Sequence, residues 1–230
     1  MTKILVSDPI DQRGIDILAQ VAQVDQKLGL SPFDLKSTIA DYDALMIRSG
    51  TQVTSEVIQA SEKLRIIGRA GVGVDNVDVP AATKRGVLVV NSPGGNTIAA
   101  AEHALALLLS LSRHIPHAHS STLEGRWDRK KYVGNELYKK TLGVVGLGKI
   151  GSHVAKVAKA MGMEIIAYDP FISSELAQQM QVGLTSIESL FQQADFITLH
   201  LPRTPETENL VNLKLLSTMK KTARLVNCAR

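Results

Sequence analysis

The pattern with the clearest chemical meaning is a set of three glycines in the spacing G-x-G-x-x-G at residues 146–151. An apolar, strand-like run precedes it and an amphipathic, helix-like run follows it, as a dinucleotide-binding turn requires. The first glycine permits a tight turn, the second lets a pyrophosphate approach the backbone, and the third lets the helix pack closely. Free N–H groups at the start of the helix then attract the phosphate oxygens. The turn residues predicted to contact the dinucleotide are Gly146, Gly148, Lys149, Ile150 and Gly151.

An acidic residue stands where the adenosine ribose of such a cofactor is bound. Asp169 ends the next strand-like run, 18 residues beyond Gly151. A carboxylate at this place accepts hydrogen bonds from the ribose hydroxyls. It also repels the additional 2′-phosphate of NADP, so the sequence favours NAD. The alternative is that the glycine turn is a tight βα turn without a ligand and that Asp169 and Pro170 merely open a turn, but the spacing and the context together favour the cofactor.

Two further strand-like runs, residues 195–199 and 224–227, end in residues that we expect beside the cofactor. In open α/β sheets, ligands bind at the carboxyl ends of the strands. Arg230 would emerge near the nicotinamide, where a guanidinium can clamp a carboxylate and polarise a neighbouring carbonyl oxygen. The alternative for Arg230 is an ordinary surface arginine. The residues expected to contact the cofactor here are Leu201, Pro202, Cys228, Ala229 and Arg230.

The elements that must position these residues alternate along the chain, which predicts an α/β fold with parallel sheets covered by helices on both faces. Turn residues at 91–96 and a long apolar helix at 97–112 predict a domain boundary, with domains at 1–96 and 97–230. The predicted strands are residues 3–6, 44–47, 65–67 and 87–90, which we expect to be buried, and residues 142–145, 164–168, 195–199 and 224–227. The predicted helices are residues 15–21, 55–60, 79–84, 97–112, 150–160, 174–180, 187–193 and 213–219.

Composition bounds the class of protein. The 230 residues suffice for two small domains, and 44% hydrophobic with 21% charged residues is typical of a soluble globular protein. The net charge of +4 is modest and does not call for nucleic acid. The single cysteine excludes an internal disulfide and favours a reducing, cytoplasmic location. We expect no signal peptide, and the longest apolar stretch, residues 99–111, is too short to span a membrane.

Several segments together resemble the D-isomer-specific 2-hydroxyacid dehydrogenase family. They are residues 70–76, 146–151 with 168–170, 201–207 and 226–230. Residues 47–54 and 127–131 resemble in particular the members whose substrate is 3-phosphoglycerate. The resemblance runs along the chain from Lys3 to Arg230. It implies a flavodoxin-like substrate-binding domain at 1–96 and a Rossmann-type NAD-binding domain at 97–230.

The resemblance also implies a reaction, the NAD-dependent oxidation of 3-phosphoglycerate to 3-phosphohydroxypyruvate in serine synthesis. By this resemblance, Arg230 would hold the substrate carboxylate and carbonyl oxygen, and it is the one predicted catalytic residue that this sequence contains. Arg48 and Arg69 are candidates for a phosphate or carboxylate, and solvated charges at strand ends are their alternative. In residues 70–74 the glycines can turn backbone N–H groups toward a carboxylate, or form only a tight turn. The predicted substrate-binding residues are Arg48, Arg69, Gly71, Val72 and Gly73, with Val72 also expected to contact the cofactor.

The sequence departs from the family pattern beyond Arg230. The family's glutamate and proton-accepting histidine, its last Rossmann strands and the segment that returns to the first domain all lie downstream. We therefore expect the chain to be the front portion of a longer protein, with its second domain truncated and without activity by itself. Two alternatives stay open: a reductase of glyoxylate, hydroxypyruvate or lactate with the same fold, and a module that holds NAD without catalysis.

Other chemically active residues receive weaker interpretations. The basic run at 126–131 is either a solvated face or, by resemblance, part of the interface of a homodimer or homotetramer. His114, His117 and His119 have a spacing that superficially suits a metal, but Pro116 interrupts them and no cysteine is near, so no metal site is predicted. We interpret His200 as a structural histidine at a strand end. No membrane or nucleic-acid partner is expected.

Overall fold

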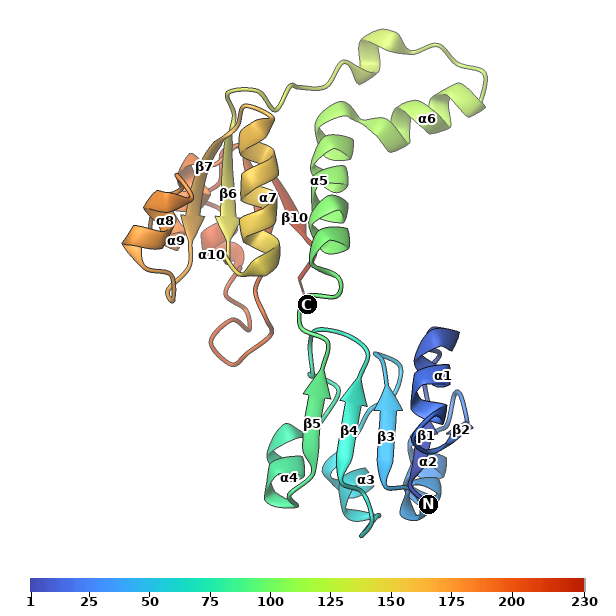
Figure 1. The fold of residues 1–230 in the computed structure, drawn as a ribbon. Helices are drawn as coiled ribbons and strands as arrows, with labels where there is room; N and C mark the ends of the chain where they lie inside the picture. Colours follow the sequence, from blue (N-terminus) through green and yellow to red (C-terminus); the bar gives the residue numbers. More distant parts are fainter. Residues whose placement is uncertain (230) are drawn as a thin grey trace. The chain divides into compact units, whose positions relative to one another are not determined.

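A computed structural model describes residues 1–229, so the interpretations of Arg230 fall outside the described residues. The chain divides into two compact units, Met1–Asn96 and Thr97–Arg230. Each unit contains its own five-stranded sheet, in which every strand pair is parallel. Figure 1 shows that each sheet is accompanied by helices, and the predicted α/β class with two doubly wound parallel sheets is confirmed.

The first unit has the strand order β2-β1-β3-β4-β5, which is the flavodoxin-like doubly wound order. Its strands are β1 (Lys3–Val6), β2 (Gln23–Gln26), β3 (Ala44–Ile47), β4 (Ile66–Arg69) and β5 (Leu88–Asn91). Its helices are α1 (Gln12–Ala19), α2 (Pro32–Thr38), α3 (Ser55–Gln59) and α4 (Val79–Lys84), with a 3-10 turn η1 (Ile39–Asp41). Asp11, Ser31 and Asp78 cap α1, α2 and α4 by accepting N–H groups of the first turn.

The two faces of the first sheet are covered unequally. On one face Leu35 of α2, Val57 of α3 and Ala82 of α4 pack in one core. On the other face Ile15 of α1 packs against Ile4 and Val6 of β1. The strand at the far edge, β5, is largely exposed: the predicted strand at 87–90 is present, but the prediction that it is buried was wrong beyond Val87.

The second unit has the order β10-β9-β6-β7-β8; read from the β8 edge and counted from β6, this is 3-2-1-4-5 of the Rossmann order. Its strands are β6 (Thr141–Val145), β7 (Glu164–Tyr168), β8 (Gly183–Leu184), β9 (Phe196–Leu199) and β10 (Arg224–Asn227). Its helices are α5 (Thr97–Arg113), α6 (Ile115–Leu123), α7 (Lys149–Ala160), α8 (Ser174–Gln179), α9 (Ile187–Gln193) and α10 (Leu213–Leu216), with a 3-10 turn η2 (Arg129–Tyr132).

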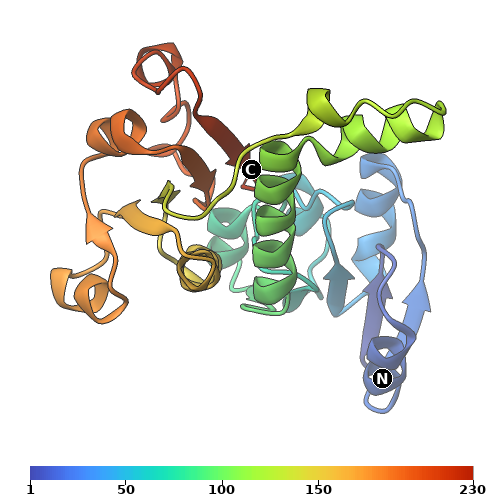
Figure 2. The same cartoon turned by 90° about the horizontal axis from the view of Figure 1, so that it is seen from above.

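Helices cover both faces of the second sheet. On one face α5 and α7 lie side by side in both views (Figures 1 and 2), and their buried alanines and leucines form one core with β6, β7, β9 and β10. On the other face α9 and α10 pack against β6 and β9. Gly143 of β6 faces α9, where any side chain would collide with Leu190 and Ala194. No helix among the described residues is long and apolar enough to cross a membrane.

Four elements had no counterpart among the predicted ones: β2, β8, α2 and α6. The two strands lie at sheet edges and are largely exposed or half-buried, so they lack the continuous apolar run that marks a buried strand. Pro116 stands in the first turn of α6, where proline is tolerated, rather than breaking a helix. His114 adopts a left-handed conformation with φ of 55° and separates α5 from α6.

Truncation of a core phenylalanine tests this packing. Phe191 of α9 is completely buried, so Phe191→Ala should lower the free energy of unfolding of the second unit by about 3–5 kcal/mol through lost contacts and a cavity. Phe171→Ala is the matched control, because that ring is 95% exposed and its loss should change stability by less than about 0.5 kcal/mol. Urea unfolding followed by circular dichroism measures both. Equal destabilisation by the two substitutions would contradict the assignment of this core.

Candidate functional site

The glycine turn joins β6 to α7 and has no room for side chains on its inner side. Gly146 has a φ of 93°, a conformation that glycine adopts far more readily than other residues. A side chain there would meet the carbonyl group of His200 and the side chain of Leu201. A side chain at Gly151 would collide with the carbonyl oxygen of Gly146, so α7 can begin this close to β6 only with glycine at that position. The turn is thus packed against its own helix and against the end of β9.

The outer side of the turn is open. A side chain at Gly148 would meet no atom of the described residues within 4 Å, and no side chain caps α7, whose N-cap is Gly148. The first turn of this 12-residue helix therefore receives no side-chain acceptor from its N-cap residue. Together with the helix dipole, the N–H groups of this first turn form an arrangement that attracts an anionic group such as a pyrophosphate. The residues present fit the cofactor predicted from the sequence.

Asp169 lies next to this turn at the end of β7. One carboxylate oxygen accepts the Leu147 N–H at 2.8 Å, and the other accepts the Phe171 N–H at 2.9 Å. The sequence predicted Asp169 only as a ribose contact. In the structure it also holds the glycine turn to the neighbouring strand. Each carboxylate oxygen has a second lone pair, so these two bonds leave it able to accept ribose hydroxyls.

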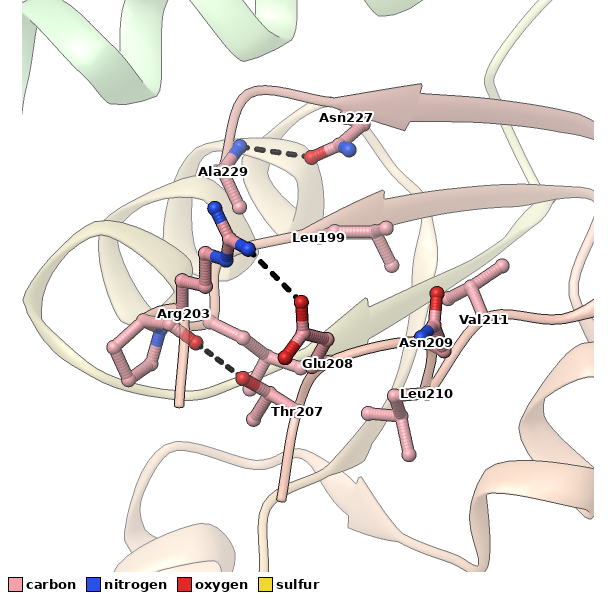
Figure 3. A pocket seen from close by; sticks show the side chains of 11 residues that line it. Leu199, Arg203, Thr207, Glu208, Asn209, Leu210, Val211, Asn227 and Ala229 are labelled. Carbon is pink, nitrogen blue, oxygen red and sulfur yellow. Dashed lines mark hydrogen bonds and ion pairs between the residues drawn. The ribbon is translucent and has the colours of Figure 1, made fainter. Parts of the chain in front are cut away.

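A pocket of about 280 Å³ lies at the carboxyl ends of β9 and β10 (Figure 3). Its wall is held in shape by polar contacts: Arg203 pairs with Glu208 at 2.9 Å, and the Thr207 hydroxyl donates to the Pro202 carbonyl at 2.6 Å. Both of these contacts were absent from the sequence predictions, because side chains in a long loop carry no periodic signal. The lining residues are Leu199, Leu201, Pro202, Arg203, Thr207, Glu208, Asn209, Leu210, Val211, Asn227 and Ala229.

His200 lies between the glycine turn and this pocket. Its N–H donates to the Val145 carbonyl at 2.8 Å, and its Nε2 lies 2.9 Å from the Thr198 hydroxyl. Burial lowers the pKa of its imidazole from 6.5 to about 4, because a charged ring is poorly solvated there. The ring is therefore neutral near pH 7, and its contacts are those of a structural residue.

Cys228 follows β10 but is not among the residues that line the pocket. It packs against the core beneath α5 and α7, and burial raises the pKa of its thiol. Ala229, by contrast, lines the pocket, and its N–H donates to the Asn227 side chain at 2.9 Å. In the second unit the structure thus brings the glycine turn, Asp169 and the ends of β9 and β10 to the same edge of the sheet.

The predicted substrate residues lie in the first unit, at the carboxyl ends of β3 and β4. Arg48 is exposed directly after β3. Arg69 belongs to β4 rather than following it, and it is only 5% exposed, so its alternative interpretation as a solvated charge was wrong. Its Nε donates to the Asn76 side chain at 2.8 Å. Sequence analysis missed Asn76, although it stands within one of the segments that carry the family resemblance.

The half-buried segment after β4 is held in place by backbone contacts. The Gly71 N–H donates to the Arg69 carbonyl at 2.8 Å, and the Gly71 carbonyl accepts the Ser92 N–H at 2.9 Å. The Asn91 side chain donates to the Val72 carbonyl at 2.5 Å. A side chain at Gly71 would collide with the Arg69 guanidinium. Gly71, Val72 and Gly73 are therefore positioned from both neighbouring strands, β4 and β5.

The remaining candidates lie elsewhere in the second unit. Within the basic run, Arg126 pairs with Glu124 and Asp128, and Trp127 is 79% exposed. His114 and His117 approach edge to face, with ring centroids 6.5 Å apart. Among residues 1–229 no group of three or more histidine, cysteine or acidic residues is arranged to hold a metal ion.

Comparison with known proteins identifies the family. Residues 105–230 match the family model of the D-isomer specific 2-hydroxyacid dehydrogenase NAD binding domain, and the chain belongs to this family. The D-3-phosphoglycerate dehydrogenase of Synechocystis sp. is 64% identical over 230 residues, which are 100% of this chain and 42% of that protein. That of Methanocaldococcus jannaschii is 52% identical over 231 residues, 100% of this chain and 44% of that protein. The chain thus spans less than half the length of these curated relatives.

Solved structures agree with the fold. The TT0316 protein from Thermus thermophilus matches with a TM-score of 0.91 at 33% identity, over 100% of this chain and 74% of that one. The NAD⁺-bound 3-phosphoglycerate dehydrogenase of Entamoeba histolytica matches with a TM-score of 0.83 at 31% identity, over 100% of this chain and 72% of that one. The predicted family resemblance is confirmed.

The low pKa of His200 predicts how stability depends on pH. Since its folded pKa of about 4 lies below its ordinary value of 6.5, the folded state binds the proton more weakly than the unfolded state. The stability contributed by the neutral ring is complete above pH 6.5 and is lost as the pH falls toward 4. The His200→Gln variant should therefore lose less stability than the wild type as the pH falls over this interval, as measured by urea unfolding at each pH. An identical pH dependence in the two proteins would contradict the buried, neutral state of the ring.

Proposed function

We propose that the second unit binds NAD(H) and that the whole protein oxidises 3-phosphoglycerate to 3-phosphohydroxypyruvate. The observation that carries the proposal is the glycine turn, closed on its inner side, open at Gly148 and fastened to Asp169. The family assignment and the 64% identity to a D-3-phosphoglycerate dehydrogenase support the choice of cofactor and substrate. The interpretation of the two units as a substrate-binding and an NAD-binding domain is part of this proposal.

In the proposed mechanism, the chain's own residues bind and orient the cofactor. The N–H groups at the start of α7 hold the pyrophosphate, with Gly148, Lys149 and Ile150 forming the contact surface. Asp169 accepts the ribose hydroxyls and disfavours a 2′-phosphate. Leu201, Pro202 and Ala229 border the cofactor at the ends of β9 and β10. Bound at these residues, NAD⁺ would supply the hydride acceptor for oxidation of the substrate hydroxyl.

The substrate is an anion at both ends, and the first unit offers groups that bind anions. Arg48 is exposed and provides a planar guanidinium suited to a phosphate or carboxylate. Gly71, Val72 and Gly73 can offer backbone N–H groups to a carboxylate. Val72 is proposed to contact the cofactor as well, and Arg230 to act on the carboxylate and carbonyl oxygen. Arg69 is assigned a supporting role, because its side chain is buried on Asn76.

The proposal also includes the oligomeric state of the protein and its cellular location. Leu123, Trp127 and Val133 are all more than two-thirds exposed on and after α6, at 76%, 79% and 68%. Large apolar side chains gathered in one segment favour burial against another subunit, so we include a homodimer or homotetramer in the proposal. One cysteine in 230 residues fits a reducing compartment such as the cytoplasm.

The role of Asp169 in cofactor choice can be tested by titration. Asp169→Ala should weaken NADH binding about tenfold and narrow the difference between NADH and NADPH, because ribose contacts and the repulsion of a 2′-phosphate are lost together. Asp195→Ala is the matched control: its carboxylate accepts the Thr141 N–H at 2.9 Å at the amino end of the same sheet. This control should leave the ratio of the NADH and NADPH dissociation constants unchanged. An unchanged ratio in Asp169→Ala would count against the assigned role.

The substrate class can be tested by calorimetry on the 230-residue chain. We expect 3-phosphoglycerate to bind at least about tenfold more tightly than lactate or glyoxylate, and Arg48→Gln to remove most of this difference. Arg13→Gln is the control, because Arg13 is an exposed arginine of the same unit that pairs with Asp11. Equal affinity for phosphorylated and plain acids would contradict the proposed substrate. Turnover by this chain would contradict the expectation that it is inactive by itself.

A further inference from the structure

A buried polar network lies beneath the turn that carries Arg48. Asp8 follows β1 and is almost completely buried. A single oxygen of its carboxylate accepts both the Arg48 N–H at 2.6 Å and the Thr51 N–H at 3.0 Å. Beside it, the hydroxyls of Ser7 and Thr51 lie 2.9 Å apart. The carboxylate therefore fixes the N–H groups at the first and the last residue of the turn 48–51.

The carbonyl groups of the same two residues are fixed by another side chain. The amide nitrogen of Asn76 donates to the Arg48 carbonyl at 2.7 Å and to the Thr51 carbonyl at 2.6 Å. The amide oxygen of Asn76 accepts the Arg69 Nε at 2.8 Å, which fixes the orientation of the amide. Both Asn76 and Arg69 are buried, at 5% exposure each. The turn is thus held at both ends, through its N–H groups by Asp8 and through its carbonyls by Asn76.

Between these fixed ends, the turn presents an exposed tip made of Ser49 and Gly50, beside the exposed side chain of Arg48. A side chain at Gly50 would come within 2.6 Å of the second carboxylate oxygen of Asp8, so the turn lies directly on that carboxylate. Among residues 1–229, no hydrogen bond involves the N–H of Ser49 or of Gly50. Asp8 draws the flanking N–H groups inward, and those of the tip stay available to a ligand.

We propose that Asp8 and Asn76 are positioning residues that hold the turn 48–51 in the shape that binds the substrate's anionic group. The inference rests on the proposed function, because Arg48 is the group that would contact the phosphate or carboxylate. A loop that must be ordered on binding loses affinity through its conformational entropy, and a loop already fixed does not. Asp8 acts here as a hydrogen-bond acceptor, and its negative charge is not required. Asn76 acts as a double donor.

Substitutions at the two residues that keep the side-chain size, Asp8→Asn and Asn76→Asp, should have contrasting effects on substrate affinity. Asp8→Ala removes the acceptor, while Asp8→Asn keeps an oxygen that can accept both N–H groups. Asn76→Asp keeps the size and the Arg69 contact but replaces the double donor by an acceptor facing two carbonyls. Asp43→Ala is the matched control, because the Asp43 carboxylate accepts the Lys3 N–H at 2.8 Å at the amino end of the same sheet.

Titration of 3-phosphoglycerate into the 230-residue chain, followed by backbone amide NMR, gives affinity and loop order together. Asp8→Ala and Asn76→Asp should weaken binding about tenfold and raise the mobility of the Ser49 and Gly50 amides. Asp8→Asn should recover most of the affinity lost in Asp8→Ala. Asp43→Ala should lower thermal stability and leave the affinity within about twofold. Thermal unfolding of every variant shows whether a loss of affinity accompanies a loss of fold.

The outcomes separate the inference from the proposed function. If the wild-type chain binds 3-phosphoglycerate and Asn76→Asp binds it equally well with a rigid turn, the positioning role is overturned while the substrate assignment stands. Equal losses in Asp43→Ala and Asp8→Ala would reduce Asp8 to a general stabilising residue and also overturn the inference. If the wild type fails to bind, the proposed substrate is contradicted and the inference falls with it.

Discussion

A hydrogen bond of 2.8 Å from the Leu147 N–H to the Asp169 carboxylate holds the glycine turn against the end of β7. The bond adds to the close packing of Gly146 and Gly151 and fixes the turn before a ligand arrives, so no affinity is lost to ordering it. The carboxylate that recognises ribose in the proposed function therefore also shapes the loop that receives the phosphates. Binding and local structure depend on the same side chain.

The first unit contains a similar interaction at the carboxyl edge of its own sheet. Asp8 follows β1 and accepts N–H groups from the loop after β3, as Asp169 follows β7 and accepts one from the loop after β6. At the carboxyl edge of a parallel sheet the chain leaves the regular ladder, and its N–H groups need other acceptors. In each unit, the carboxylate of an aspartate that follows the neighbouring strand is such an acceptor. In both sheets, despite their different strand orders, an aspartate carboxylate accepts N–H groups of a loop at the carboxyl edge.

Aspartates also stand at the amino edges, with different consequences. Asp43 accepts the Lys3 N–H and Asp195 accepts the Thr141 N–H, each joining the starts of two adjacent strands. These bonds fix how the strands align. The carboxyl edges are where open α/β sheets bind ligands, so a carboxylate there shapes loops that meet a substrate or cofactor. The position in the sheet, and not the residue type, separates the structural aspartates from those placed near function.

The sequence by itself determined the features that depend on neighbouring residues. The alternation of apolar runs and helical patterns sufficed for the α/β class, and the spacing of Gly146, Gly148 and Gly151 identified the turn, because the steric demands of a tight turn are local. The edge strands β2 and β8 were missed, since exposed strands carry no continuous apolar run.

Only the tertiary structure decided what the buried polar residues do. The partners of Asp8 lie 40 and 43 residues away, and the two carbonyls that Asn76 holds lie 28 and 25 residues away. Arg69 was predicted to bind a substrate anion or to be a solvated charge at a strand end, yet its side chain is buried and donates to Asn76. Spacing along the chain carries no record of such pairs, because a parallel sheet brings together strand ends that the intervening helices separate widely in sequence.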